Sequence, residues 1–277
     1  MTWGAWGSKF STAKMRSLFE EAFSLGINTF DHADIYGGYT TELEFGKAFH
    51  QSSISRESVT FITKCGIQMP CDARPLPVKY YDFSAAHIRM SVENSLRNLH
   101  TEYIDVLLLH RPSPLMQAEI IAEEIHKLQD EGKVKQLGVS NFTPSQIQLL
   151  QTKLSVKWNQ LECSLSQEAP LFDGTLDHMK ANNIGAMAWS PLGIYFKEKN
   201  PQQQRIKKTL DPLCQKYNCT EDQLLLAWLM HHPSYVYPVV GTTSGARLKK
   251  AVEATTIKLE ITDWFLLLEA SMGKPLP

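Results

Sequence analysis

The most regular feature of the sequence is an alternation of short apolar runs with longer amphipathic stretches. The apolar runs predict strands at residues 27–30, 59–63, 103–109, 133–139, 156–160, 184–189 and 235–240. These runs lack a clean alternation of apolar and polar positions, which is typical of strands covered on both faces. The pattern therefore favours a buried, parallel sheet.

Between these runs, apolar residues recur at helical spacing. The spacing predicts helices at 12–25, 41–49, 84–99, 117–131, 144–154, 172–182, 204–217, 220–231 and 245–254, with an extra C-terminal helix at 262–272. Ser84 and Thr143 are residue types that cap helix N-termini, and Gly26 and Gly132 follow predicted C-termini. Helix boundaries are thus marked as well as helix interiors.

Strand–helix alternation along the whole chain predicts βαβ units, with seven strand–helix pairs after one leading helix. We therefore expect an α/β fold of the (β/α)8 TIM-barrel type. Barrels of about 250 residues often form one domain, and no linker or change of composition divides the chain, so a single domain over 1–277 is expected. A doubly wound sheet is the structural alternative, but the GxGxxG motif that it should carry is absent from the sequence.

Composition narrows the classes of partner. The net charge is −1, with 43% hydrophobic and 21% charged residues, so nucleic acid and anionic membranes are not expected partners. The five cysteines have no CxxC and no spacing typical of a disulfide framework or a metal site, which favours scattered, reduced thiols. No signal peptide or membrane-length apolar stretch is present. We expect a cytosolic monomer without a metal.

The longest stretch without a regular pattern is 65–83, which contains Pro70, Pro75 and Pro77. A loop of this length inside a compact barrel often has a function, here as a wall of the substrate pocket. A variable surface loop is an equally open interpretation.

Polar residues stand where the predicted strands end. They are Asp31, Lys64, His110, Ser140 with Asn141, Gln160, Ser190, and Gly241 with Thr242. Each one alone has an ordinary interpretation as a turn residue, a solvated charge or a structural histidine. The carboxyl ends of barrel strands meet on one face, which carries the active site of barrel enzymes. Seven successive polar strand ends therefore indicate a site.

These motifs, in this order, resemble the aldo-keto reductase family over nearly the whole chain, and a bacterial oxidoreductase subgroup in particular. The segment TFDHADIYG at 29–37 is similar to the family's segment around its aspartate and catalytic tyrosine. The segments similar to those of its lysine, its histidine and its cofactor contacts are TK at 63–64, LLLHRP at 107–112, GVSNF at 138–142, NQLE at 159–162 and WSPLG at 189–193.

The resemblance implies a catalytic set of Asp31, Tyr36, Lys64 and His110. Tyr36 would protonate the carbonyl oxygen, and Lys64 would lower the phenol's pKa from its ordinary value of about 10. Asp31 would keep the buried lysine charged, and His110 would orient the substrate oxygen. An aromatic plug over the barrel mouth is the ordinary alternative for Tyr36, but its three partners in register argue against that role.

The resemblance also implies NADPH as the cofactor, with NADH possible. The nicotinamide carboxamide would be held by Ser140, Asn141 and Gln160, and Trp189 would stack on the ring unless it is ordinary core. The pyrophosphate would follow Ser190, Leu192 and Gly193, and the 2′-phosphate would lie at a helix N-terminus, contacting Thr242, Ser244 and Arg247.

Two departures from the family pattern indicate a loose cofactor preference. Gly241 stands where many members have a lysine, and Lys250 with Ala251 replaces a polar pair that often contacts adenine. A third departure is at the start, where Thr2 and Trp3 resemble the end of the first barrel strand. We therefore expect the first strand and the N-terminal hairpin to be incomplete, as in a truncated product.

The expected function is reduction of aldehydes or ketones, quinone-like and dicarbonyl compounds included, to alcohols by hydride transfer from NADPH. A non-catalytic NADPH-binding regulatory subunit or redox sensor on the same fold is the alternative. The complete set of four residues favours catalysis, because a binding module has no need of the lysine–aspartate pair. A third interpretation is a barrel lyase with Lys64 as a Schiff-base amine.

Overall fold

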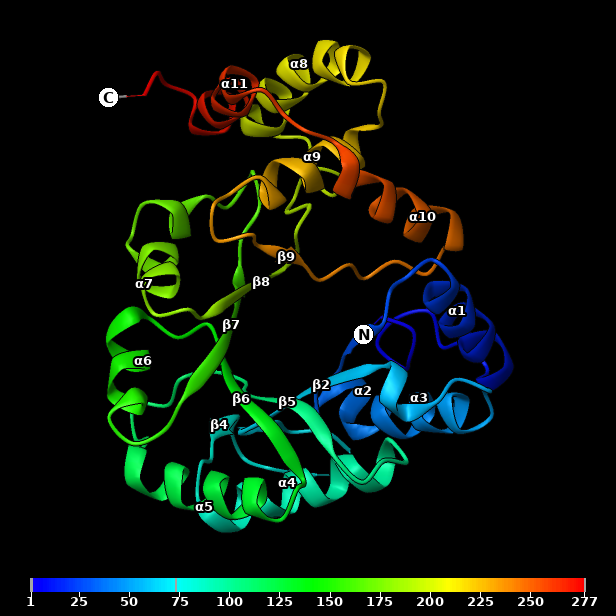
Figure 1. The fold of residues 1–277 in the computed structure, drawn as a ribbon, viewed down its shortest axis with the longest axis vertical. Helices are drawn as coiled ribbons and strands as arrows, with labels where there is room; N and C mark the ends of the chain where they lie inside the picture. The colour runs from blue at the N-terminus through cyan, green and yellow to red at the C-terminus, as the bar shows by residue number, and fades with distance from the viewer. Residues whose placement is uncertain (1, 73, 277) are drawn as a thin grey trace. The chain divides into compact units, whose positions relative to one another are not determined.

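The computed structural model describes residues 2–72 and 74–276 (Figure 1). The chain forms two compact units. The first unit is Met1–Asn159 with Gly241–Gly245, and the second is Gln160–Val240 with Ala246–Pro277. Each unit contains parallel strands with helices packed on them. The prediction of one domain over 1–277 stays a prediction.

The first unit is built on parallel strands whose hydrogen-bonding order is β1, β2, β5, β6. Their bounds are Thr29–Asp31 for β1, Thr60–Cys65 for β2, Ile104–Leu109 for β5 and Val134–Ser140 for β6. The strand β7 (Val156–Glu162) begins in this unit and ends in the second. In the parallel register Asp31 pairs with Ile62 and Lys64 with Leu108. The carboxyl ends of β1, β2 and β5 therefore meet at one edge.

Helices cover these strands close to the predicted positions. They are α1 (Thr12–Ser24), α3 (Thr41–His50), α4 (Ala85–Asn98), α5 (Ala118–Asp130) and α6 (Pro144–Gln151), with a 3-10 turn at Arg56–Ser58. The Ser84 side chain caps α4, and Thr143 forms a capping box with Gln146 at α6. Phe19, Phe45 and Phe61 are fully buried and join the helices to the sheet through edge-on ring contacts.

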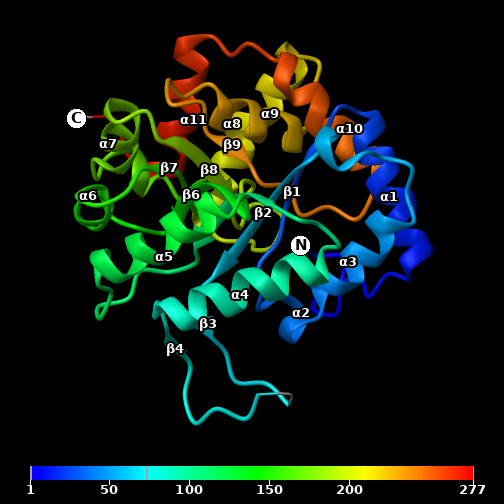
Figure 2. The ribbon, with the colours of Figure 1, turned by 60° about the horizontal axis from the view of Figure 1, so that its bottom comes forward.

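Two features near β1 were not predicted. A tight four-residue turn, α2 (Tyr36–Tyr39), follows β1, and its two glycines have left-handed rather than helical backbone angles. Within the predicted 65–83 loop, β3 (Ile67–Gln68) and β4 (Tyr80–Tyr81) form an antiparallel hairpin, seen below α4 in Figure 2. The Met69 N–H donates to the Tyr39 hydroxyl over 2.9 Å, so the hairpin packs on the turn that carries Tyr36. Two-residue strands are too short to show periodicity in the sequence.

In the second unit, β8 (Gly185–Trp189) pairs in parallel with β9 (Tyr237–Pro238). The helices are α7 (Thr175–Ala181), α8 (Pro201–Lys216), α9 (Glu221–Met230), α10 (Gly245–Glu253, of which Gly245 belongs to the first unit) and α11 (Ile261–Met272), with 3-10 turns at Ala169–Leu171 and Ala254–Thr256. β9 is shorter than predicted. Pro238 has no N–H to donate, which weakens the ladder there.

The extra C-terminal helix α11 packs beside α8 and α9 (Figure 1). The indole rings of Trp228 in α9 and Trp264 in α11 stack with centroids 4.9 Å apart and planes within 8°. Each indole N–H donates to the other residue's carbonyl oxygen, over 3.0 and 2.9 Å. The indole N–H groups of both tryptophans are therefore satisfied. Ring stacking and the two hydrogen bonds together join α11 to the core of the unit.

The α/β class with a parallel sheet is confirmed, and each of the seven predicted strands is present among the described residues. No strand precedes β1 within residues 2–28. Instead, the Thr2 hydroxyl and the Trp3 indole N–H donate to the carbonyl oxygens of Gly241 and Thr242, over 2.6 and 2.8 Å. In the part of the chain that the structure describes, no helix is long and apolar enough to cross a membrane.

We expect Trp264→Ala to lower the free energy of unfolding by about 3–5 kcal/mol, because it removes a buried ring and leaves a cavity. Urea denaturation followed by circular dichroism measures the change. Leu266→Ala, on the same helix but 49% exposed, is the matched control and should have little effect. Equal losses in the two variants would show that α11 is not anchored through Trp264.

Candidate active site

The Lys64 ammonium is buried and fully bonded. The residue is 1% exposed, and Nζ donates to Oδ1 and Oδ2 of Asp31 and to the His32 carbonyl oxygen, each over 2.7 Å. A buried charge needs such partners, because its lost hydration costs several kcal/mol. The register of β1 with β2 therefore produces a buried ion pair at the carboxyl end of the strands.

This pair keeps the lysine protonated. Burial is the largest single influence and lowers the pKa of Lys64, but Asp31 and Tyr36 together raise that pKa above its ordinary value. Asp31 is the largest of the influences that raise the pKa of Lys64. Lys64 thus presents a fixed positive charge beside Tyr36.

Tyr36 is positioned by a turn of two glycines. Gly37 and Gly38 have φ values of +67° and +68°, in the left-handed region that favours glycine. A Cβ on Gly37 would also lie 2.5 Å from the Thr41 hydroxyl oxygen. The turn places the Tyr36 ring with its centroid 5.1 Å from Lys64 Nζ and 5.9 Å from the His110 ring centroid.

The pKa of Tyr36 differs from the sequence expectation. Burial raises the pKa of Tyr36 above its ordinary value, and the nearby Lys64 charge offsets this only in part. The expected lowering by lysine is present but smaller than the effect of burial. Tyr36 therefore carries its proton at neutral pH, which is the form that a proton donor needs.

His110 follows β5 and is 8% exposed. Burial, followed by the charges of Lys64 and Arg111, holds the pKa of His110 well below its usual range. The imidazole is therefore neutral near pH 7. A neutral ring can donate a hydrogen bond to a substrate oxygen without adding another charge beside Lys64.

One supporting residue was missed by the sequence analysis. Glu42 of α3 is 2% exposed, and it accepts hydrogen bonds from the Thr63 hydroxyl over 2.5 Å and from Ser95 of α4 over 3.0 Å. Thr63 directly precedes Lys64, so Glu42 helps to fix the end of β2. The signal in the sequence was an acidic residue on the buried side of an amphipathic helix.

In the first unit, Ser140 and Asn141 lie at the end of β6, whereas Gly241, Thr242 and Ser244 lie in the segment between β9 and α10. Ser140 ends β6 and is buried, and the Asn141 amide donates to its hydroxyl over 2.8 Å. Asn141 has φ +61°, which turns the chain sharply after the strand. The Ser244 N–H donates to the Thr242 hydroxyl over 3.2 Å, just before α10. These hydroxyl and amide groups are the polar types that a carboxamide and a phosphate require.

In the second unit, Gln160 is buried in β7, Trp189 ends β8, and the exposed Arg247 lies in α10.

The chain turns sharply after β8. Ser190 and Gly193 have φ values of +50° and +53°, and the Gly193 N–H donates to the Ser190 carbonyl over 2.7 Å. A Cβ on Gly193 would lie 1.8 Å from the Ser166 hydroxyl. Leu192 packs against the cluster of Leu226, Met230 and Ala254. Ser190 and Gly193 thus form a tight left-handed turn directly after β8, with the Gly193 N–H bonded within the turn.

The chain belongs to the aldo/keto reductase family, whose pattern it matches over residues 1–270. It is 40% identical to the uncharacterized oxidoreductase YcsN of Bacillus subtilis (97% of this chain, 91% of the relative) and 37% identical to the oxidoreductase YdhF of Escherichia coli (99% and 93%). A 6-dehydroglucose reductase of Agrobacterium fabrum is 36% identical (95% and 90%). The protein is therefore an oxidoreductase of this family.

Solved structures show the same fold. The thermostable aldo-keto reductase Tm1743, in a complex with the inhibitor epalrestat, superposes with a TM-score of 0.81 at 26% identity (97% of this chain, 93% of that chain). The glycerol dehydrogenase AKR11B4 of Gluconobacter oxydans gives a TM-score of 0.86 at 21% identity (100% and 92%), which shows the fold alone. The predicted relation to the TIM barrel of this family is confirmed.

We expect Asp31→Asn to lower the free energy of unfolding by about 3 kcal/mol at neutral pH, because it leaves the Lys64 ammonium buried without a counter-charge. A raised pKa means that wild-type Lys64 stabilises the fold below the ordinary lysine pKa, and that this stabilisation disappears as pH rises through the folded-state value. Urea denaturation at several pH values measures both effects.

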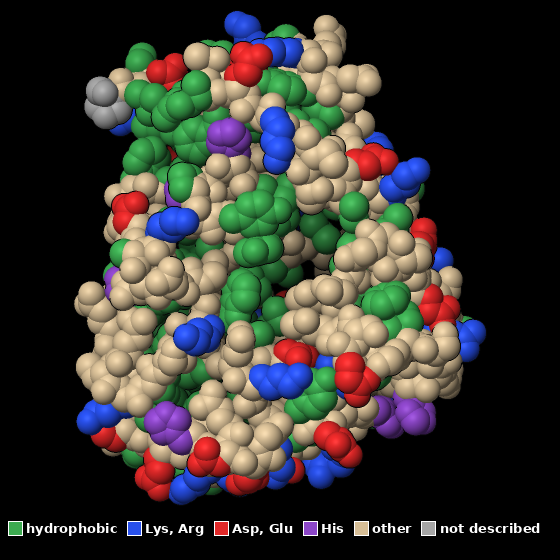
Figure 3. Space-filling view, viewed as in Figure 1, with side chains coloured by type: hydrophobic (Ala, Val, Ile, Leu, Met, Phe, Trp, Pro, Cys, Tyr) green, Lys and Arg blue, Asp and Glu red, His purple; other side chains and the backbone are tan. Residues whose placement is uncertain are grey.

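The control for this experiment is a surface ion pair. Basic and acidic side chains alternate along the bottom of Figure 3. On α5, the exposed side chains of Lys127 and Glu123 form an ion pair over 2.7 Å. Glu123→Gln should leave stability unchanged, since exposed pairs contribute little. A similar result for Asp31→Asn would contradict the structural role of the buried pair.

Proposed function

We propose that this protein reduces aldehydes and ketones to alcohols with NADPH, with Tyr36 as the general acid. One observation supports this most strongly: the buried Lys64 ammonium is bonded to both Asp31 oxygens and lies 5.1 Å from the Tyr36 ring centroid. A binding module has no use for so costly an ion pair beside a phenol. The proposed roles of Tyr36 and NADPH are supported by this geometry and by the family relationship.

Each of the four residues has a distinct task. Reduction places negative charge on the carbonyl oxygen, and the Tyr36 hydroxyl gives that oxygen a proton. The phenolate that remains is stabilised by the adjacent Lys64 charge, which Asp31 maintains. Neutral His110 donates a hydrogen bond that orients the oxygen. When bound, NADPH supplies the hydride to the carbonyl carbon.

Each unit contains residues that the family resemblance implies as cofactor contacts. In the first unit they are Ser140, Asn141, Gly241, Thr242 and Ser244, and in the second they are Gln160, Trp189, Ser190, Leu192, Gly193 and Arg247. Amides and hydroxyls suit the carboxamide, backbone N–H groups suit the pyrophosphate, and the Arg247 guanidinium suits a phosphate dianion. A cytosolic location and a monomeric state remain predictions.

The substrate class is small carbonyl compounds. Two relatives, at 36% and 33% identity, are 6-dehydroglucose reductases, so a sugar aldehyde is a reasonable test compound beside an activated aromatic aldehyde. The lyase interpretation is disfavoured by Lys64 itself. Its ammonium makes three hydrogen bonds and has a raised pKa, so it lacks the free lone pair that Schiff-base formation requires.

We expect Tyr36→Phe to lower kcat by about 100-fold to 10,000-fold while NADPH still binds, because the variant lacks only the proton donor. Oxidation of NADPH with an activated aromatic aldehyde measures turnover, and quenching of tryptophan fluorescence measures binding. Because the pKa of Tyr36 is raised, wild-type turnover should persist at neutral pH and fall only above about pH 10.

Tyr103→Phe is the matched control, since Tyr103 lies just before β5, at the opposite end of that strand from His110. It should retain wild-type turnover. Binding of NADPH without any turnover that depends on Tyr36 would favour the regulatory subunit or redox sensor instead.

A second prediction concerns cofactor preference. In the first unit, Glu21 of α1 lies so close to Gly245 that a Cβ there would be 1.7 Å from Glu21 Oε1. The Glu21 carboxylate thus lies at the start of α10, next to Ser244, which is proposed to contact the 2′-phosphate of NADPH. The negative charges of the carboxylate and the phosphate would repel each other. We expect Glu21→Gln to raise the ratio of kcat/KM for NADPH over NADH about fivefold.

Steady-state kinetics with both cofactors measures this ratio. Glu20→Gln is the control, because Glu20 pairs with Arg16 on the same helix. If Glu21→Gln leaves the ratio unchanged, the 2′-phosphate does not bind at this helix start.

A further inference from the structure

Two of the five cysteines meet at a helix end of the second unit. Cys214 lies in the last turn of α8, and Cys219 directly precedes Thr220, the N-cap of α9. The Cys219 N–H donates to the Cys214 carbonyl over 3.0 Å, and the Asn218 N–H donates to the Gln215 carbonyl over 3.3 Å. With Asn218 at φ +48°, these bonds form a Schellman C-terminal motif.

This motif brings the two cysteine side chains together. In a Schellman motif the residue that donates the outer hydrogen bond contacts the residue that accepts it, and here these are Cys219 and Cys214. The shared backbone bond limits the separation of their Cα atoms to less than about 7 Å, within the reach of a disulfide. Each of the two thiols also influences the pKa of the other.

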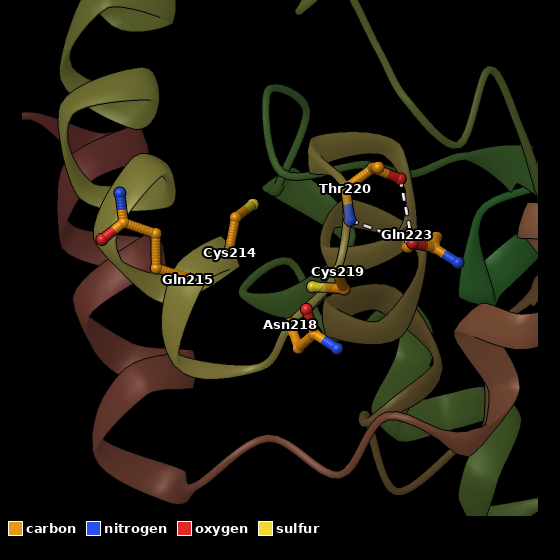
Figure 4. A pocket seen from close by; sticks show the side chains of 6 residues that line it. All are labelled: Cys214, Gln215, Asn218, Cys219, Thr220 and Gln223. Atoms are coloured by element: carbon orange, nitrogen blue, oxygen red, sulfur yellow. Dashed lines mark hydrogen bonds between the residues drawn. The ribbon is translucent and has the colours of Figure 1, made fainter.

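The pair is accessible to small molecules. Cys214 and Cys219 line a hollow of about 390 Å³ together with Gln215, Asn218, Thr220 and Gln223 (Figure 4). Both cysteine side chains lie in the space between α8 and the start of α9, and both residues are partly exposed. Cys65 and Cys163, by contrast, are buried.

We propose that Cys214 and Cys219 form a reversible disulfide when the protein is exposed to hydrogen peroxide. One thiolate attacks a peroxide oxygen and breaks the O–O bond, which gives a sulfenic acid and, with one proton, water. The second thiol loses its proton and attacks the sulfenyl sulfur, so that an S–S bond forms and a second water leaves. Two thiols are oxidised by two electrons, and one peroxide is reduced to two waters.

Cys219 is the better first nucleophile. Burial raises the pKa of Cys214 to about 12, and it also raises the pKa of Cys219, although the interaction with Cys214 lowers the latter. Because only the thiolate attacks, oxidation should accelerate as the pH rises above neutrality. The Cys214–Cys219 disulfide would join the last turn of α8 to the start of α9. In the first turn of α9, the Gln223 amide donates to the Glu253 carboxylate at the end of α10 over 2.9 Å.

The test counts thiols in the full chain after exposure to excess hydrogen peroxide. The denatured protein is alkylated with N-ethylmaleimide, and its intact mass is measured by mass spectrometry. The reduced chain should carry five labels and the oxidised chain three, with loss of two hydrogen atoms, and dithiothreitol should restore all five. Peptide mapping without reduction should then find the bond between Cys214 and Cys219.

Three variants complete the experiment. Cys214→Ser and Cys219→Ser should each abolish the paired loss of labels, whereas Cys71→Ser, which removes another partly exposed thiol, should keep it. The proposal is overturned if the wild type retains five labels, if the bond maps to another pair, or if it joins two chains. None of these readouts depends on reductase activity, so the proposed function stands or falls separately.

Discussion

The burial of one positive charge is the constraint on which the first unit's chemistry depends. The Lys64 ammonium is removed from water and donates to Asp31 and to the His32 carbonyl. Without Asp31, the pKa of a lysine in this position would fall, because burial disfavours the charged form. The partner is supplied by the sheet itself, because the parallel register sets Asp31, the last residue of β1, opposite Ile62, two residues before Lys64 on the neighbouring strand.

The same burial sets the protonation states of the neighbouring groups. It raises the pKa of Tyr36 and lowers the pKa of His110, so the phenol keeps its proton and the imidazole is neutral. One environment therefore yields a charged lysine, a protonated phenol and a neutral histidine. Burial alone would neutralise all three groups, and it is Asp31 that makes Lys64 the exception.

The surrounding structure keeps this arrangement in place. The left-handed glycines after Tyr36 let the chain turn within two residues, and the β3–β4 hairpin packs on Tyr39 at the other end of that turn. Glu42 joins α3 to β2 and α4 through hydroxyl groups. None of these groups takes part in the proposed chemistry, yet each restricts the movement of a residue that does.

The sequence by itself determined the order of strands and helices, most of their boundaries and the polar strand ends, including Asp31, Lys64 and His110. These features are encoded locally, in apolar periodicity, caps and glycines, and the parallel sheet then brings the strand ends together. Only the tertiary structure decided the net direction of the Tyr36 pKa, the support from Glu42, the approach of Glu21 to Gly245 and the meeting of Cys214 with Cys219. Each of these depends on burial or on backbone geometry that composition and spacing do not specify. For that reason cysteines that were expected to be scattered form a pair, and a phenol expected to have a lowered pKa has a raised one.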